Sequence, residues 1–323
     1  MGRNAADVSL RLLFIRPLPF RRLVRLIPLA IFFPILGLGQ QVLEVQWATV
    51  NGAAPFPLEG ETRDWLPALR MAVNAMPEES VISMCLTQSE LMGLTTEEAK
   101  HLGLLFSSYY KRVRQTKAFI DAPSALAYCF SETKPRQGLA TVYVPGKFTA
   151  GTKAIVFLHG YGGSLLAYLH YLSNTYPNDL IICPAYGISP DRIPFEYVAE
   201  AEKAVSARLH TAIENPLLIG LSAGGFAAGR LFAQRPESFR KVCCIAAYLP
   251  SDALARLNRT MNLRFIAGGK EPYVADGSFR QQMLAIKPIV RSLDWRIVDK
   301  ADHFFLLSHE ELTQKVLREW EAP

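Results

Sequence analysis

The sequence predicts an α/β fold, in which a mainly parallel, eight-stranded sheet carries helices on both faces and follows a helical N-terminal region. From residue 122 onward, short apolar and β-branched runs alternate with amphipathic helical stretches. This alternation is typical of a parallel sheet that is covered on both sides. Hydrophobic residues make up 50% of the 323 residues, which is enough for one large core with a small appended unit.

The expected strands are short and nearly continuous in apolar residues. They cover residues 126–130, 140–146, 153–160, 179–187, 215–222, 241–248, 263–269 and 294–299. Helical patterns lie between the later strands, at 165–175, 195–210, 223–234 and 277–290, and a last one covers 310–321. No helix separates the first two strands, so we expect them to form an antiparallel edge.

Three regions follow from these patterns: 1–40, 41–120 and 121–323. Residues 61–120 look helical, and Thr95 and Glu98 have the spacing of a capping box. No cluster of residues in 41–120 suggests chemistry.

Only residues 249–262 separate the sixth and seventh strands, so the last region has no large cap of its own. One hypothesis is that the helices of 61–120 act as that cap.

The N-terminal region resembles an export signal or a membrane anchor. Arginines dominate residues 1–25, and residues 26–39 are uncharged but short for a bilayer and interrupted by Pro28 and Pro34. We therefore expect the protein to be exported (periplasmic or secreted) or anchored, and residues 21–39 could associate with a membrane. A buried N-terminal helix in a soluble protein is the alternative.

The charge distribution argues against a nucleic-acid partner. Most of the formal net charge of +6 lies in the first 25 residues, and the remainder of the chain is close to neutral. The five cysteines are an odd number without zinc-type spacing, which predicts buried thiols and neither a disulfide framework nor a metal site. No organic cofactor is expected.

The strongest chemical signal is Gly220-Leu221-Ser222-Ala223-Gly224, which lies between an apolar strand and a helix rich in small residues. A strand–turn–helix elbow holds a serine exposed in a strained conformation, and glycines are needed where a side chain would collide across the turn. Ser222 is therefore the predicted nucleophile.

A second signal is His159-Gly160-Tyr161-Gly162-Gly163, directly after the strand at 153–160. A loop at this place normally supplies one donor of an oxyanion hole. We expect the backbone amides of Tyr161 and Ala223 to form that hole, and His159 to be structural.

His303 is the predicted general base among six histidines, because it follows the last strand and can reach the sheet edge where Ser222 lies. The orienting acid is expected just past the seventh strand. Glu271 occupies that position, Asp276 is the next candidate, and Asp252 after the sixth strand is the third.

With these motifs in this order, residues 122 to about 320 resemble an α/β-hydrolase, near the esterase and dienelactone-hydrolase-like groups. The resemblance rests on HGYGG, GLSAGG, GGKEPYV and ADHFF, and glutamate stands where aspartate is usual. It implies a serine hydrolase that cleaves a carboxylic ester through an acyl-serine intermediate, with a small-molecule ester or acyl substrate. Peptide or amide hydrolysis and acyl transfer would use the same residues.

Two hypotheses from other functional classes remain. One is a catalytically silent scaffold with this fold, and the other is a membrane-tethered interaction protein that works through residues 40–120. Tyr161, Tyr186 and Tyr248 fall at the carboxyl ends of strands, where ligands bind in open sheets, so they could line an acyl pocket. Core packing would explain each of them as well. The sequence does not set the oligomeric state.

Overall fold

The computed structural model describes residues 39–49, 61–86, 95–130, 137–188 and 190–321. The predicted export signal or anchor lies almost wholly outside these residues and stays a prediction. Within the described ranges, no helix is both long enough and apolar enough to span a membrane.

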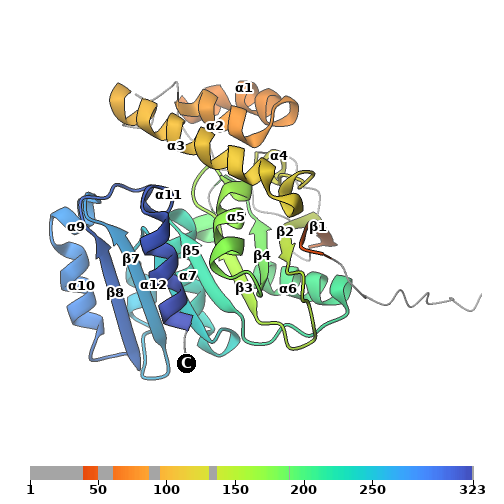
Figure 1. Ribbon diagram of the computed structural model, residues 1–323. Coiled ribbons are helices and arrows are strands. Elements are labelled where there is room, and N and C mark those ends of the chain that lie inside the picture. Colours follow the sequence, from red (N-terminus) through yellow and green to blue (C-terminus); the bar gives the residue numbers. More distant parts are fainter. Residues whose placement is uncertain (1–38, 50–60, 87–94, 131–136, 189, 322–323) are drawn as a thin grey trace, which may run out of the picture. The chain divides into compact units, whose positions relative to one another are not determined.

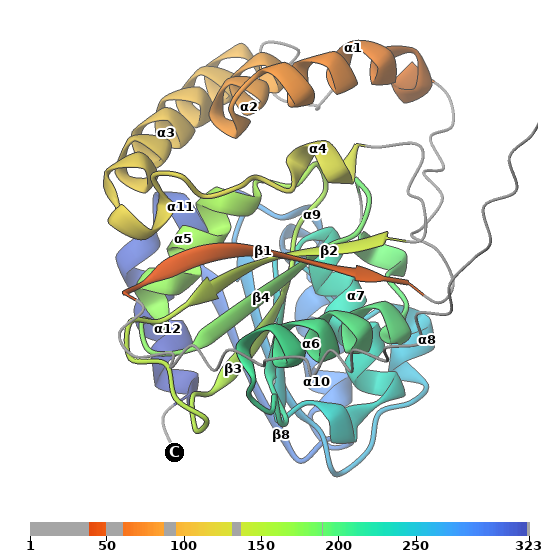
Figure 2. The ribbon, with the colours of Figure 1, turned by 90° about the vertical axis from the view of Figure 1, so that its right-hand side faces the viewer.

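A single eight-stranded sheet forms the centre of the fold, in the order β1-β2-β4-β3-β5-β6-β7-β8. β1 and β8 are its two edges (Figures 1 and 2). β1 pairs antiparallel with β2, and β2 antiparallel with β4, whereas all other pairs are parallel. The strands are β1 (Gln41–Ala48), β2 (Gln137–Val144), β3 (Ala154–Leu158), β4 (Leu180–Ala185), β5 (Leu217–Leu221), β6 (Lys241–Ile245), β7 (Asn262–Gly268) and β8 (Ser292–Val298).

Helices cover both faces of the sheet, as the sequence predicts. One hydrophobic cluster joins one sheet face to α5, α11 and α12, and a second joins the opposite face to α6, α7 and α10. Adjacent Cys243 and Cys244 fall in different clusters, because successive strand residues point to opposite faces. These helices are α5 (Leu165–Thr175), α6 (Phe195–Leu209), α7 (Ala223–Gln234), α10 (Ser278–Ile286), α11 (Phe305–Ser308) and α12 (Glu310–Glu321).

The predicted first strand, 126–130, is wrong. Residues Leu126–Cys129 form the short helix α4, and the Ser124 hydroxyl accepts the Leu126 amide at its start. A short apolar run cannot be assigned to strand or helix by periodicity alone. The edge strand is instead β1, so the region expected to be helical from residue 41 begins with a strand. Its alternation of Leu43, Val45 and Trp47 with polar residues gave a period-two signal that the sequence reading missed.

The helical region consists of α1 (Glu61–Ala75), α2 (Glu78–Leu86) and α3 (Thr96–Gln115). The predicted capping box at Thr95 and Glu98 is confirmed at the start of α3. α2 and α3 share the hydrophobic cluster of α5 and the sheet, with Leu102, Phe106 and Tyr109 buried in it. These helices therefore complete the core of the sheet rather than forming a core of their own.

Short helices complete the described chain. They are η2 (Lys117–Phe119), η3 (Pro190–Arg192), η4 (Pro236–Ser238), α8 (Ser251–Leu254) and α9 (Pro272–Ala275). α8 is the one helix between β6 and β7, so the short connection expected there is confirmed.

Candidate active site

Ser222 stands at a sharp turn between β5 and α7, with φ 54° and ψ −118°. Positive φ is unfavourable for a residue with a side chain and costs about 1–3 kcal/mol. The turn is closed by glycines: a Cβ at Gly220 would lie 2.0 Å from the Gly224 carbonyl oxygen, and one at Gly224 would lie 2.1 Å from the Leu158 carbonyl oxygen. Both neighbours are backbone and cannot move aside, so the packing forces glycine at both positions.

His303 and Glu271 extend from Ser222 in a continuous hydrogen-bonded chain. His303 Nε2 lies 3.0 Å from Ser222 Oγ, and His303 Nδ1 lies 2.7 Å from Glu271 Oε1. Because a carboxylate oxygen can only accept, Nδ1 carries the proton and Nε2 is left to accept from the serine hydroxyl. The structure thus brings together the three residues that the sequence proposed as nucleophile, base and acid.

The loops after β7 and β8 hold this pair in place. The Lys270 amide donates to the Ala301 carbonyl at 2.9 Å, and a Cβ at Gly268 would collide with the Asp302 carbonyl oxygen at 2.5 Å. Glu271 is buried at 6% exposure, whereas the His303 side chain is 40% exposed. The acid is therefore shielded from water while the histidine faces the site.

The two other candidate acids are engaged elsewhere. Asp276 accepts the Ser278 amide at 2.8 Å, and this bond lowers the pKa of Asp276. Asp252 pairs with Arg230 Nε at 2.8 Å. Of the three acids that the sequence left open, Glu271 is the one hydrogen-bonded to His303.

The loop at residues 160–163, called the oxyanion loop below after the role that the sequence predicts for it, begins beside the nucleophile. A Cβ at Gly160 would lie 3.5 Å from Ser222 Cβ. Gly162 and Gly163 have φ of 75° and 63°, and the Gly162 amide donates to the Ile188 carbonyl at 2.8 Å. No acceptor among the described residues takes the amides of Tyr161 or Ala223. These two amides are the donors that the sequence predicts for an oxyanion hole.

His159 has a structural position, as expected. It is fully buried, its Nδ1 donates to the Gly160 carbonyl at 2.8 Å, and its Nε2 accepts the Tyr186 amide at 3.4 Å. One neutral tautomer satisfies both contacts, so the ring ties the oxyanion loop to the end of β4.

The three tyrosines proposed for an acyl pocket differ in exposure. Tyr161 and Tyr248 are 60% and 37% exposed, but Tyr186 is 8% exposed and packs on Tyr197 with ring centroids 4.9 Å apart. For Tyr186 the structure supports core packing. Tyr248 lies between Phe226 and Tyr273, so an aromatic row runs from the first turn of α7 to the residues after Glu271.

The sequence analysis did not predict two aromatic neighbours of the site. Tyr273 places its buried hydroxyl toward Glu271, and its pKa is raised first by burial and then by that carboxylate. Phe106 of α3 contacts Phe304, the neighbour of His303, with centroids 5.8 Å apart. Proximity to Glu271 in sequence could have suggested Tyr273, but nothing local links Phe106 to residue 304.

A cavity of about 770 Å³ lies apart from these residues, lined by Arg192, Phe195, Arg230, Arg235 and neighbouring side chains. Ser222, His303 and Glu271 are not among the residues that line it.

No family model matches the chain, and no curated protein matches it. Among solved structures, a predicted CIB-like hydrolase from Thermoplasma acidophilum is 15% identical with a TM-score of 0.44, covering 57% of this chain and 91% of that one. The poly(3-hydroxybutyrate) depolymerase LpqC from Bordetella parapertussis is 17% identical with a TM-score of 0.44, covering 58% and 85%. Fluorophosphonate-binding serine hydrolase F from Staphylococcus aureus is 13% identical with a TM-score of 0.44, covering 58% and 95%.

These likenesses are distant, and the fold of the chain follows from its own sheet topology. The sheet order, with antiparallel strands at the β1 edge and parallel strands beyond, places the Ser222 turn after β5, Glu271 after β7 and His303 after β8. A serine elbow, an acid and a histidine in that chain order are the arrangement of the α/β-hydrolases. The chain has the α/β-hydrolase fold.

Proposed function

We propose that the protein is a serine hydrolase that cleaves a carboxylic ester through an acyl-serine intermediate. The observation that carries the proposal is the hydrogen-bonded chain from Ser222 Oγ through the His303 ring to Glu271. A serine hydroxyl is a weak nucleophile unless a positioned base takes its proton, and this geometry provides that base.

In the first half-reaction, Ser222 Oγ attacks the ester carbonyl while His303 Nε2 takes the hydroxyl proton. The carbonyl oxygen becomes negative and is stabilised by the amides of Tyr161 and Ala223, and Glu271 stabilises the imidazolium. The carbon–oxygen bond to the leaving group then breaks, and the proton on Nε2 passes to the departing alcohol. Ser222 is left acylated.

In the second half-reaction, water takes the place of the alcohol. His303 Nε2 removes a proton from the water as it attacks the acyl carbonyl, the same two amides bind the oxyanion, and the proton returns to Ser222 Oγ as the acid departs. The exposed face of His303 allows water to approach. The two half-reactions use only the chain, the ester and water.

The test is hydrolysis of a p-nitrophenyl ester series of increasing acyl length by the full-length protein, beside Ser222→Ala. We expect activity with at least one ester, loss of that activity in the variant, and fluorophosphonate labelling of the wild type alone. Labelling without ester turnover would favour an amide or a peptide as the substrate. A folded protein with neither labelling nor turnover would refute the enzyme and favour the silent scaffold.

A further inference from the structure

A buried carboxylate from the helical region sits at the start of α5. Glu78, the first residue of α2, is 4% exposed. Its Oε1 accepts the Leu166 amide at 2.9 Å and the Tyr110 hydroxyl, and its Oε2 accepts the Ser124 hydroxyl at 2.6 Å. The Ala167 amide also faces this carboxylate. Four donors therefore converge on one side chain in the protein interior.

These contacts give Glu78 the role of a helix cap that comes from a distant part of the chain. The N-terminal amides of a helix lack intrahelical acceptors, and an anion there also interacts favourably with the helix dipole. Ser164, at the N-cap position of α5, makes no capping hydrogen bond with its own side chain. Glu78 fills that role for the second and third residues of α5.

The capped helix begins next to the oxyanion loop. α5 starts at Leu165, two residues after Gly163, where a Cβ would lie 3.6 Å from both Leu126 of α4 and Leu165. At its other end, the loop follows His159 and β3. The backbone between these two anchors carries the Tyr161 amide, so the position of the first turn of α5 helps to set where that amide points.

We propose that Glu78 is a positioning residue for the oxyanion loop, so that the helical region takes part in the chemistry of Ser222 by capping α5. This inference rests on the function proposed above. Through Glu78 and the first turn of α5, α2 would then help to position the loop. A cap, by contrast, would act by covering the substrate.

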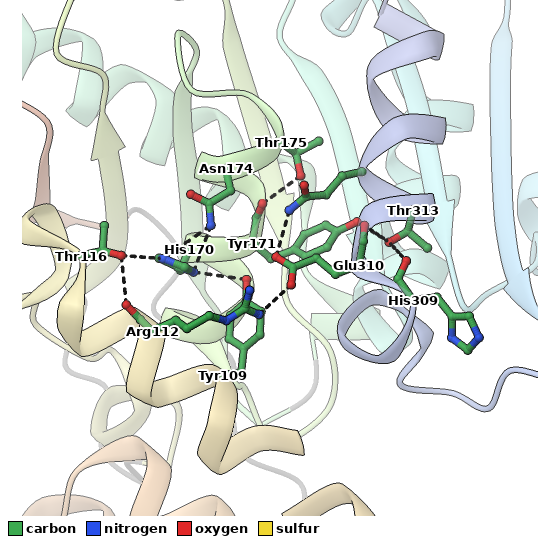
Figure 3. A network of polar contacts seen from close by, with 11 residues as sticks. Tyr109, Arg112, Thr116, His170, Tyr171, Asn174, Thr175, His309, Glu310 and Thr313 are labelled. Carbon is green, nitrogen blue, oxygen red and sulfur yellow. Dashed lines mark hydrogen bonds and ion pairs between the residues drawn. The ribbon is translucent and has the colours of Figure 1, made fainter. Parts of the chain in front are cut away.

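A second link between the helical region and α5 serves as an internal control. Thr116, after α3, contacts His170 Nε2 at 2.9 Å, and Arg112 pairs with Glu310 of α12 at 2.6 Å (Figure 3). His170 lies on α5 beyond the first turn, away from the loop. A variant here loosens the same docking of α3 on α5 without touching the cap.

The experiment compares Glu78→Ala, Glu78→Gln and Thr116→Val in the full-length protein. Each is assayed for kcat and KM on the best p-nitrophenyl ester, for the fluorophosphonate labelling rate and for urea unfolding. Losing a donor of an oxyanion hole costs about 10²–10³ in kcat, and misplacing one should cost less, so we expect about a tenfold to hundredfold drop in kcat for Glu78→Ala. KM should stay within about threefold, since the oxyanion contact strengthens in the transition state.

The conservative variant separates positioning from general stability. Gln keeps one oxygen for the two amides and a donor for a hydroxyl, so Glu78→Gln should recover most of the lost kcat. Thr116→Val should lower stability but leave kcat within twofold. If Glu78→Ala does not fold, Glu78→Asp takes its place, because its shorter side chain withdraws the carboxylate from the amides, and its kcat should fall below that of Glu78→Gln.

Three outcomes would overturn the inference: wild-type kcat in a folded Glu78→Ala, equal loss in Thr116→Val, or equal kcat in the Asp and Gln variants. Each of these leaves the serine hydrolase intact, because the wild type still turns over ester and labels at Ser222. A wild type that does neither removes the proposed function, and the inference with it.

Discussion

Replacing Glu271 with glutamine tests which carboxylate orients His303 in the proposed triad. The carboxylate lies 2.7 Å from His303 Nδ1 and is 6% exposed, so water cannot take its place. Glutamine carries no charge to stabilise the imidazolium, and its amide can donate to Nδ1, which would put the proton on Nε2 and block acceptance from Ser222. Removing the acid of a Ser-His-Asp triad in this way lowers kcat by about 10⁴-fold. That loss corresponds to about 5 kcal/mol of transition-state stabilisation.

The assay is kcat and KM on the best p-nitrophenyl ester for Glu271→Gln, with Asp276→Asn and Asp252→Asn as matched controls. Each control also changes one carboxylate to its amide, and each of these acids has another partner. We expect the controls to stay within about threefold of wild type, since neither contacts His303. A Glu271→Gln variant that keeps more than a tenth of the activity, or a control that loses as much, would refute the assignment of the acid.

Two further predictions concern the elbow and the acid stability of the fold. In Gly224→Ala the new Cβ would meet the Leu158 and His159 carbonyl oxygens at 2.1 and 2.5 Å, so we expect loss of Ser222 labelling and destabilisation of about 3 kcal/mol or more; a labelled variant with wild-type melting would contradict this. Burial, and then the Arg112 charge, lower the pKa of His170 from 6.5 to about 4. Neutral His170 therefore contributes up to about 3 kcal/mol of stability above pH 6.5, and this contribution is lost progressively as the pH falls from 6.5 to 4. Urea unfolding at pH 7 and 4.5 should show a smaller loss in His170→Gln than in wild type, and equal losses would argue against it.

The polar contacts around His170 show that the fold creates an electrostatic environment that the local sequence does not reveal. His170 is 3% exposed, and it contacts the Tyr109 hydroxyl and Thr116 while Arg112 pairs with Glu310 nearby (Figure 3). In the sequence it is one of six histidines and falls within the predicted helix at 165–175. Burial lowers the pKa of His170 first, and Arg112 of α3, more than fifty positions away in the chain, lowers it further.

By itself, the sequence determined the alternating strands and helices after residue 137, the Ser222 turn and the place of His303. These follow from short-range physics: apolar periodicity sets the elements, and backbone sterics allow only glycine at Gly220 and Gly224. The choice among Glu271, Asp276 and Asp252 did not follow, because all three lie in the segments that directly follow β6 or β7. Only the distance of each carboxylate from His303 separates them, and folding sets that distance.

The tertiary structure also decided what completes the sheet and its site. β1 became the edge strand by pairing along its whole length with β2, nearly a hundred residues later, while the run at 126–130 became a helix. Glu78 finds the first turn of α5 in the same way, across 88 positions of sequence. Such partners are chosen by the packing of distant segments and by the need to satisfy buried polar groups, and neither has a periodic signature in the chain.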